Sequence, residues 1–290
     1  MTTNPTAPIP CQRWRDRRDS FRSSAEPFDP SRFGVELIET DSVAREFVKR
    51  HHYSGSYPAA RVRVGLYRSA GVFGDELVGV AVFSVPMSQR VIPKYTGRPS
   101  SEGVELGRFV LLDDVRANAE SWFLSRAFGV LAEAKPEVAA VLSYSDPVRR
   151  TAADGSTVLP GHVGTIYQAT NARYVGRSKY RNDWIAANGR IVSPRALSKI
   201  RKGETGARYA TAKLLELGAP ARRFGEDPAE WVRRALSDGP FRKVRHPGNH
   251  AYLFAVGGSK RQRRQTAKAF PPSLPYPKAD AGGVVLDLAA

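Results

Sequence analysis

Two short, almost uniformly apolar segments on either side of one helical segment constrain the fold of this chain more than any other feature. The first runs from Glu105 to Leu112 and the second from Val138 to Tyr144. Such runs are typical of strands buried on both faces of a sheet. The segment Ala119–Ala134 between them predicts a helix. In a strand–helix–strand unit of this kind, the residues at the carboxyl end of the second strand are expected at the ligand-binding edge: Ser143, Tyr144, Ser145 and Asp146.

The flanking sequence extends this unit into a mixed α/β sheet. The apolar patterns predict further segments: a strand at Val35–Ile38, a helix from Asp41, strands at Arg61–Tyr67 and Leu77–Val85 that form a hairpin, a short helix at Val163–Thr170, and one or two strands at Tyr174–Trp184. The order β-α-β-β-β-α-β-α-β resembles the core of the GNAT acetyltransferase superfamily. In that fold two parallel strands splay apart, and an acyl thioester lies between them; here these strands are Glu105–Leu112 and Val138–Tyr144.

Composition indicates a polyanionic partner. The chain has 45 Lys and Arg against 28 Asp and Glu, a net charge of +17, and this excess favours contact with nucleic acid. A solvated, Arg-rich surface is the alternative. Cys11 is the only cysteine, so a disulfide framework and a thiolate zinc site are excluded. No apolar run approaches the length of a membrane span. We therefore expect a cytoplasmic protein, and the sequence does not indicate its oligomeric state.

Three regions are expected along the chain. Residues 1–31 are rich in Arg, Pro and Ser and predict a flexible basic arm. Residues 32–190 carry the GNAT-like catalytic pattern. Residues 191–290 predict a basic, mainly helical extension and tail, with helix starts near Pro194, Thr205 and Pro228. This extension is the expected contact with DNA through its cations: Arg195, Lys199, Arg201, Lys202, Lys260, Arg261, Arg263 and Arg264.

Several polar residues are candidates for chemistry. His52 and Tyr53 follow a helix end, where an exposed pair of histidines is the alternative interpretation. Asp146 lies between a buried strand and Pro147, and a simple turn aspartate is about as common there. Four side chains have the ligand types of a non-haem iron site, without a diagnostic spacing: His52, Glu105, Asp146 and His162.

A second resemblance covers roughly His51 to Trp184. The segments that carry it are His51–Gly55, Glu105–Phe109, Ser143–Asp146 and Gly161–Asn171, with Tyr174 and Gly176. They resemble the Mom family of bacteriophage DNA-modifying proteins, which belongs to the acetyltransferase-like superfamily. The resemblance implies conversion of adenine in double-stranded DNA to a carbamoylmethylated base, which protects phage DNA from restriction. It also implies an acyl-type donor and iron, with His52, Tyr53, Asp146 and Tyr167 as catalytic residues.

The donor site is less clearly marked. The superfamily uses a glycine-rich turn at a helix start, where free amides bind pyrophosphate, whereas Arg116–Ser121 contains no glycine. The candidates for binding acetyl-CoA or a related donor are Arg108, Asn118 and Ser121. An ordinary helix start capped by Asn118 is the alternative. Two other functions stay open: a conventional N-acetyltransferase acting on a protein, a small amine or a hypermodified base, and a basic DNA-binding protein without catalysis.

Overall fold

The computed structural model describes residues 10–15, 18–23, 27–69, 71, 74–155, 157–159 and 161–278. These residues form two compact units, each built from separate stretches of the chain. The first unit contains the described residues up to Ser145, together with residues 163–176 and 250–278. The second unit contains the described residues of the ranges 146–162 and 177–249. No helix in the described ranges is long and apolar enough to span a membrane.

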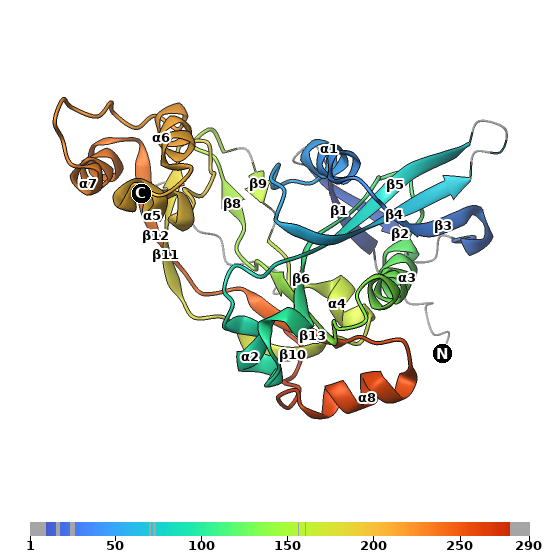
Figure 1. Ribbon diagram of the computed structural model, residues 1–290. Coiled ribbons are helices and arrows are strands. Elements are labelled where there is room, and N and C mark those ends of the chain that lie inside the picture. Colours follow the sequence, from blue (N-terminus) through green and yellow to red (C-terminus); the bar gives the residue numbers. More distant parts are fainter. Residues whose placement is uncertain are drawn as a thin grey trace, which may run out of the picture. The chain divides into compact units, whose positions relative to one another are not determined.

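A seven-stranded mixed sheet forms the centre of the first unit (Figure 1). Strands β3 to β6 are antiparallel neighbours, β6 and β7 are parallel, and β13 is antiparallel to β7. Across the sheet the order is β10 (Arg173–Arg177), β13 (His250–Ala255), β7 (Ala140–Ser145), β6 (Gly103–Leu111), β5 (Asp75–Ser84), β4 (Ala60–Ser69) and β3 (Phe33–Leu37). The mixed α/β class predicted from the sequence is confirmed.

Helices cover both faces of this sheet. In Figure 1, α1 (Asp41–His51) and α3 (Ala119–Ala134) lie on opposite sides of β4 and β5. Val80 and Val82 of β5 pack with α1, whereas Ala81 and Phe83 pack with α3. Burial on both faces explains why β5 is apolar at nearly every position. The other helices of this unit are α2 (Val91–Thr96), α4 (Thr165–Ala169) and α8 (Lys260–Lys268).

The parallel strands β6 and β7 pair over only three residues. The pairs are Gly103 with Ala140, Val104 with Val141, and Glu105 with Leu142. Both strands continue beyond the last pair, β6 to Leu111 and β7 to Ser145. The interrupted ladder confirms the splayed pair expected from the sequence, and it leaves facing backbone groups of the two strands outside the sheet's hydrogen bonding.

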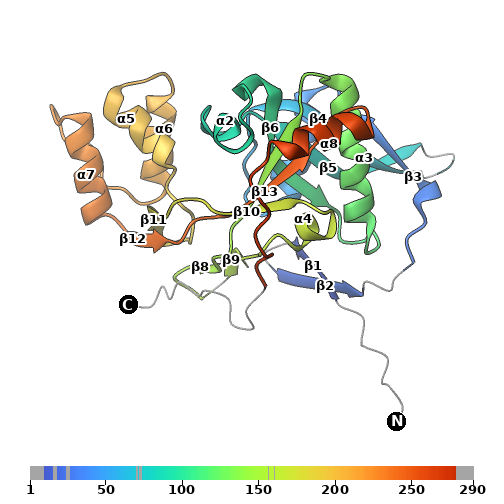
Figure 2. The same ribbon diagram turned by 90° about the horizontal axis from the view of Figure 1, so that it is seen from below.

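The second unit is a small helical body on a two-stranded sheet. Strands β11 (Arg181–Ala186) and β12 (Phe241–His246) are antiparallel. Figure 2 shows α5 (Pro194–Lys202), α6 (Ala207–Glu216) and α7 (Pro228–Asp238) on one side of them. The fully buried Trp231 of α7 is the centre of their apolar core. A short pair, β8 (Arg150–Thr151) and β9 (Thr157–Leu159), completes the unit.

The basic arm expected over residues 1–31 lies partly outside the described residues. Its described part contains β1 (Pro10–Arg15) and β2 (Arg18–Ser23), which pair in antiparallel fashion. Strand β13, from the range assigned by sequence to the extension, is an interior strand of the large sheet.

Candidate active site

Four polar side chains gather beside the splayed strands of the first unit. Burial lowers the pKa of the Arg108 guanidinium, and nearby Tyr53, Glu105 and Tyr167 act in the opposite direction. Burial raises the pKa of Glu105, and the charge of Arg108 opposes this shift. The structure therefore brings together four residues from three elements: the loop after α1, two positions on β6, and α4.

Arg108 holds the loop that carries His52 and Tyr53. Its Nε donates to the Ser56 carbonyl at 2.9 Å and its Nη2 to the Ser56 Oγ at 2.6 Å. Its Nη1 donates to the Gly107 carbonyl. Three hydrogen bonds within the protein thus occupy the guanidinium that was predicted to bind the donor. They make Arg108 a positioning residue for the loop.

The same loop fixes the orientation of His52. Its Nδ1 accepts the Ser54 N–H at 3.1 Å and lies 2.9 Å from the Ser54 Oγ. A nitrogen that accepts a backbone N–H carries no proton, so neutral His52 has its proton on Nε2. The Tyr53 ring lies against His52, with 4.2 Å between the centroids. The two predicted catalytic residues of this motif are therefore neighbours.

Gly107 is the extra residue of a β-bulge in β6, between Glu105 and Arg108. The register between β5 and β6 shifts at this point, so that Val82 pairs with Arg108 and Phe83 with Leu106. A Cβ on Gly107 would lie 2.4 Å from the Ser84 Oγ. Only glycine fits this bulge without displacing its neighbour, which accounts for the glycine in Glu105–Phe109.

Tyr167 lies in a cluster of buried aromatic residues. Its side chain is 7% exposed, and its ring centroid is 5.2 Å from that of Tyr252. Burial raises the pKa of Tyr167 far above its ordinary value, so the phenol stays protonated at neutral pH. Gly164, with φ of +75°, precedes α4, and a Cβ there would lie 2.8 Å from both rings. The glycine is needed for this packing.

Asp146 belongs to the second unit and is held by three side-chain and backbone donors. His246 lies 2.9 Å from Oδ1, the Val148 N–H donates to Oδ1 at 3.0 Å, and Arg150 donates to Oδ2 at 3.0 Å. Burial would raise the pKa of Asp146, but these hydrogen bonds and the charge of Arg150 lower it below its usual value. The carboxyl group is therefore ionised at neutral pH.

The candidate metal ligands do not form a recognisable metal site. His162 donates its backbone N–H to the Asp146 carbonyl at 2.8 Å, but His52 and Glu105 belong to the other unit. Within the described ranges no group of three or more His, Cys, Asp or Glu is arranged to hold a metal ion. The predicted iron site is thus not supported by this donor set.

Two of the donor-site candidates lie at the start of α3. Asn118 has a left-handed backbone and makes no side-chain capping bond to the helix, unlike the cap considered from sequence. Ser121 lines a pocket of about 250 Å³ together with Ser125, Phe128, Ala169, Thr170 and Asn171. Near the splay, the buried Ser143 Oγ has no hydrogen-bond partner among the described residues. These features fit a ligand with polar groups along its length.

The predicted DNA-binding cations differ in their surroundings. On α5, Arg195, Arg201 and Lys202 are exposed, and Lys199 is half-buried. Arg195 also forms a 2.6 Å ion pair with Glu204. On α8, all four predicted cations are exposed, and Thr266 is the only residue of the helix that is buried. These four are Lys260, Arg261, Arg263 and Arg264.

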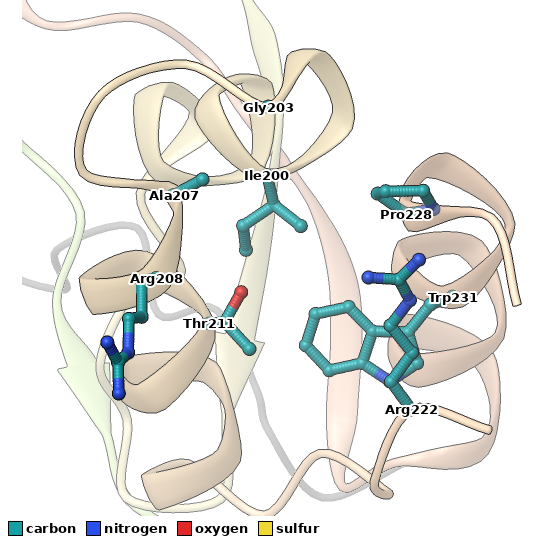
Figure 3. Close-up of a pocket in the computed structure, with 8 residues that line it drawn as sticks. All are labelled: Ile200, Gly203, Ala207, Arg208, Thr211, Arg222, Pro228 and Trp231. Atoms are coloured by element: carbon teal, nitrogen blue, oxygen red, sulfur yellow. The ribbon is translucent and has the colours of Figure 1, made fainter. Parts of the chain in front are cut away.

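A second pocket, of about 300 Å³, lies among the three helices of the second unit (Figure 3). Ile200, Thr211 and Trp231 line it together with the Arg208 and Arg222 side chains. The Trp231 indole donates to the Pro220 carbonyl at 2.9 Å. None of the candidate catalytic side chains lines this pocket, so we assign it no role in the chemistry.

Sequence reasoning missed the partners of Asp146. Arg150 is four residues away at the start of the two-residue strand β8, and His246 is separated by 100 residues in the chain. The alternation of β12 was the available signal for a strand, but its three cations among six residues made the segment resemble a loop.

The chain is similar to known proteins in sequence and in structure. The Mom protein family model matches residues 32–278. The "Methylcarbamoylase mom" of Escherichia phage Mu is 30% identical over 143 residues, which are 48% of this chain and 53% of that protein. The chain thus spans about half the length of this curated relative. A solved "Tandem GNAT protein from the clavulanic acid biosynthesis pathway (without AcCoA)" aligns over 79% of this chain and 100% of that one, with 8% identity and a TM-score of 0.39. On the extent of the family match, this chain belongs to the Mom protein family.

Proposed function

We propose that this protein modifies adenine in duplex DNA, converting the exocyclic amino group to a carbamoylmethyl group and so protecting phage DNA from restriction. The observation that carries the proposal is the polar cluster beside the interrupted β6–β7 ladder. The family match and the name of the phage Mu relative support the same chemistry. The protein would act as a transferase in the cytoplasm of an infected cell.

The charge distribution supports duplex DNA as the partner. Residues 146–162 and 177–249 contain 19 Lys and Arg against 9 Asp and Glu, a net charge of +10. Helix α8 of the first unit adds five cations and no carboxylate. A base must leave the stack before its amino group can react, at a cost of a few kcal/mol. Contacts between these cations and phosphates would offset that cost.

The environments of the polar residues support separate roles. Ionised Asp146 is a weak base and a good hydrogen-bond acceptor, so we assign it to hold the adenine amino group. The raised pKa of Glu105 makes that carboxylate the better proton acceptor. Tyr167 keeps its proton and can donate it to the leaving group. Within the first unit, His52, with its proton on Nε2, and Tyr53 would carry protons beside Glu105 and Tyr167.

We assign the acyl donor to the first unit. The unpaired backbone of β6 and β7, the Ser143 hydroxyl and the pocket at Ser121 offer polar groups to acetyl-CoA or a related thioester. When bound, such a donor would supply the two-carbon unit of the product. A carbamoylmethyl group requires a bond from the adenine nitrogen to the methyl carbon of that unit and replacement of the thiol by an amide nitrogen, whereas transfer of the acyl carbon alone would give an acetylated base. If the assignment is correct, coenzyme A raises the melting temperature of the wild-type protein and raises that of Ser121→Trp less, because the indole fills the pocket.

Mass spectrometry of nucleosides tests the proposed function. Plasmid DNA from cells that express the wild-type protein should contain a new adenosine species. Asp146→Asn and Tyr167→Phe should lower its amount by about a hundredfold or more. Asp238→Asn and Tyr209→Phe, which change exposed residues, serve as matched controls and should leave it unchanged. A conventional acetyltransferase would leave adenosine unmodified, and this result would refute the proposal.

A further inference from the structure

One donor to Asp146 comes from a buried histidine with no assigned role. Oδ1 of Asp146 accepts bonds from His246 and from the Val148 N–H, at 2.9 and 3.0 Å. Oδ2 accepts one bond, from Arg150 at 3.0 Å. Since each carboxylate oxygen offers two lone pairs, Oδ1 is fully used and Oδ2 keeps one lone pair free. This asymmetry selects Oδ2 as the atom that can meet a substrate.

The turn after β12 fixes the proton on His246. Its Nδ1 accepts the Gly248 N–H at 3.0 Å, so Nε2 carries the proton and donates it to Asp146. Gly248 has φ of +94°, and a Cβ there would lie 2.0 Å from the Ser178 carbonyl oxygen. The imidazole is 1% exposed and is bonded at both nitrogens. These two hydrogen bonds fix the orientation of the ring and keep its proton on Nε2.

We infer that His246 is a positioning residue for base modification: it holds Oδ1 of Asp146 through Nε2–H, so that the free lone pair of Oδ2 accepts a hydrogen bond from the adenine amino group. The inference rests on the proposed function. His246 acts through Asp146 and does not touch the base. A neutral imidazole is suited to this task because it orients the carboxylate without cancelling its charge.

A double-mutant cycle tests the inference. His246→Leu should lower kcat by about ten- to a hundredfold, the effect of losing one hydrogen bond to a charged group, with KM for duplex DNA changed by less than about twofold. His246→Gln keeps an N–H donor and should restore part of the loss. In the Asp146→Asn protein, adding His246→Leu should cause no further decrease, because the histidine acts through that carboxylate.

Val244→Ala, on the same strand, controls for a general weakening of β12. Equal losses in Val244→Ala and His246→Leu, or losses that multiply in the double mutant, would overturn the inference. The ring ¹⁵N chemical shifts of His246 give a readout that needs no activity. They should show the proton on Nε2 in the wild type, and a proton on Nδ1 instead would also overturn it. If wild-type protein leaves adenosine unchanged, the proposed function fails, and the ¹⁵N shifts still decide how His246 is bonded.

Discussion

Replacing Gly107 by alanine should destabilise the protein at the centre of the candidate site. The added Cβ would lie 2.4 Å from the Ser84 Oγ, 3.1 Å from Pro58 Cγ and 3.3 Å from Ser84 Cβ. Ser84 is 2% exposed and has little room to move. Overpacking of this kind costs about 1–3 kcal/mol. For a chain of this size, that corresponds to a decrease of roughly 2–12 °C in melting temperature.

A second substitution separates this steric cause from other effects of alanine. Ser84→Ala removes the nearest atom, whose own hydrogen bond to the Glu105 carbonyl is long, at 3.4 Å. The double mutant Gly107→Ala/Ser84→Ala should therefore regain most of the lost stability. Gly129→Ala is the matched control, because no atom lies within 4 Å of the added Cβ. This glycine lies within α3, so its replacement should stabilise by about 0.5–1 kcal/mol.

Thermal unfolding followed by circular dichroism gives the melting temperatures of the wild type and of the three variants Gly107→Ala, Gly107→Ala/Ser84→Ala and Gly129→Ala. The reasoning fails if Gly107→Ala melts at the wild-type temperature. It also fails if Ser84→Ala does not raise the melting temperature of the Gly107 variant.

Three further predictions concern other parts of the chain. Asp227→Ala removes a side chain that accepts the Ala229 and Glu230 N–H groups at the start of α7, and should cost about 0.5–2 kcal/mol in urea unfolding; an unchanged midpoint would contradict this. Hydrogen bonding to Arg234 lowers the pKa of Glu226 from 4.5 to about 2. This pair should stabilise the protein above pH 4.5 and lose its effect as the pH falls towards 2. The melting temperatures of wild type and Arg234→Gln should therefore converge at low pH, and a constant difference would argue against the pair. Arg261→Ala should reduce the slope of log K against log salt for duplex DNA by about 0.9; an identical slope would place this residue away from phosphate.

Periodic burial made part of the fold predictable. Helix α3 begins and ends at the predicted residues, because Phe123, Ala127 and Leu131 bury one face at helical spacing. The strands β5, β6 and β7 were recognised because burial on two faces requires continuous apolar sequence. For α2 and β12, the pattern was too short or too highly charged to compete with a loop.

Helix α8 shows a different limit. It has no apolar face, and the sequence indicated only a basic run. Its start is fixed by a capping box in which Ser259 and Gln262 bond each other's backbone N–H groups. This Ser-x-x-Gln signal was present in the sequence. Without an apolar stripe beside it, however, the signal did not distinguish a helix from a loop.

The candidate site was predictable as a set of residues and not as a set of contacts. Adjacent polar residues such as His52 and Tyr53 were found because local sequence places them together. The bonds from Arg108 to Ser56 and from His246 to Asp146 join positions 52 and 100 residues apart. Such pairs depend on how the chain folds back, which composition and periodicity do not encode.

Residues 178–249 are an insertion between strands β10 and β13, and the two ends of this insertion are hydrogen-bonded to each other. The Ser178 N–H donates to the Asn249 carbonyl at 2.8 Å, and the Asn249 N–H donates to the Ser178 Oγ at 2.9 Å. An insertion with tied ends can be lengthened, shortened or exchanged during evolution while the flanking strands keep their places. A homologue that lacks the insertion and keeps Asp146 would need another hydrogen-bond donor to this carboxylate, because His246 lies within the insertion. Loss of the insert and retention of that aspartate should therefore seldom occur together among homologues.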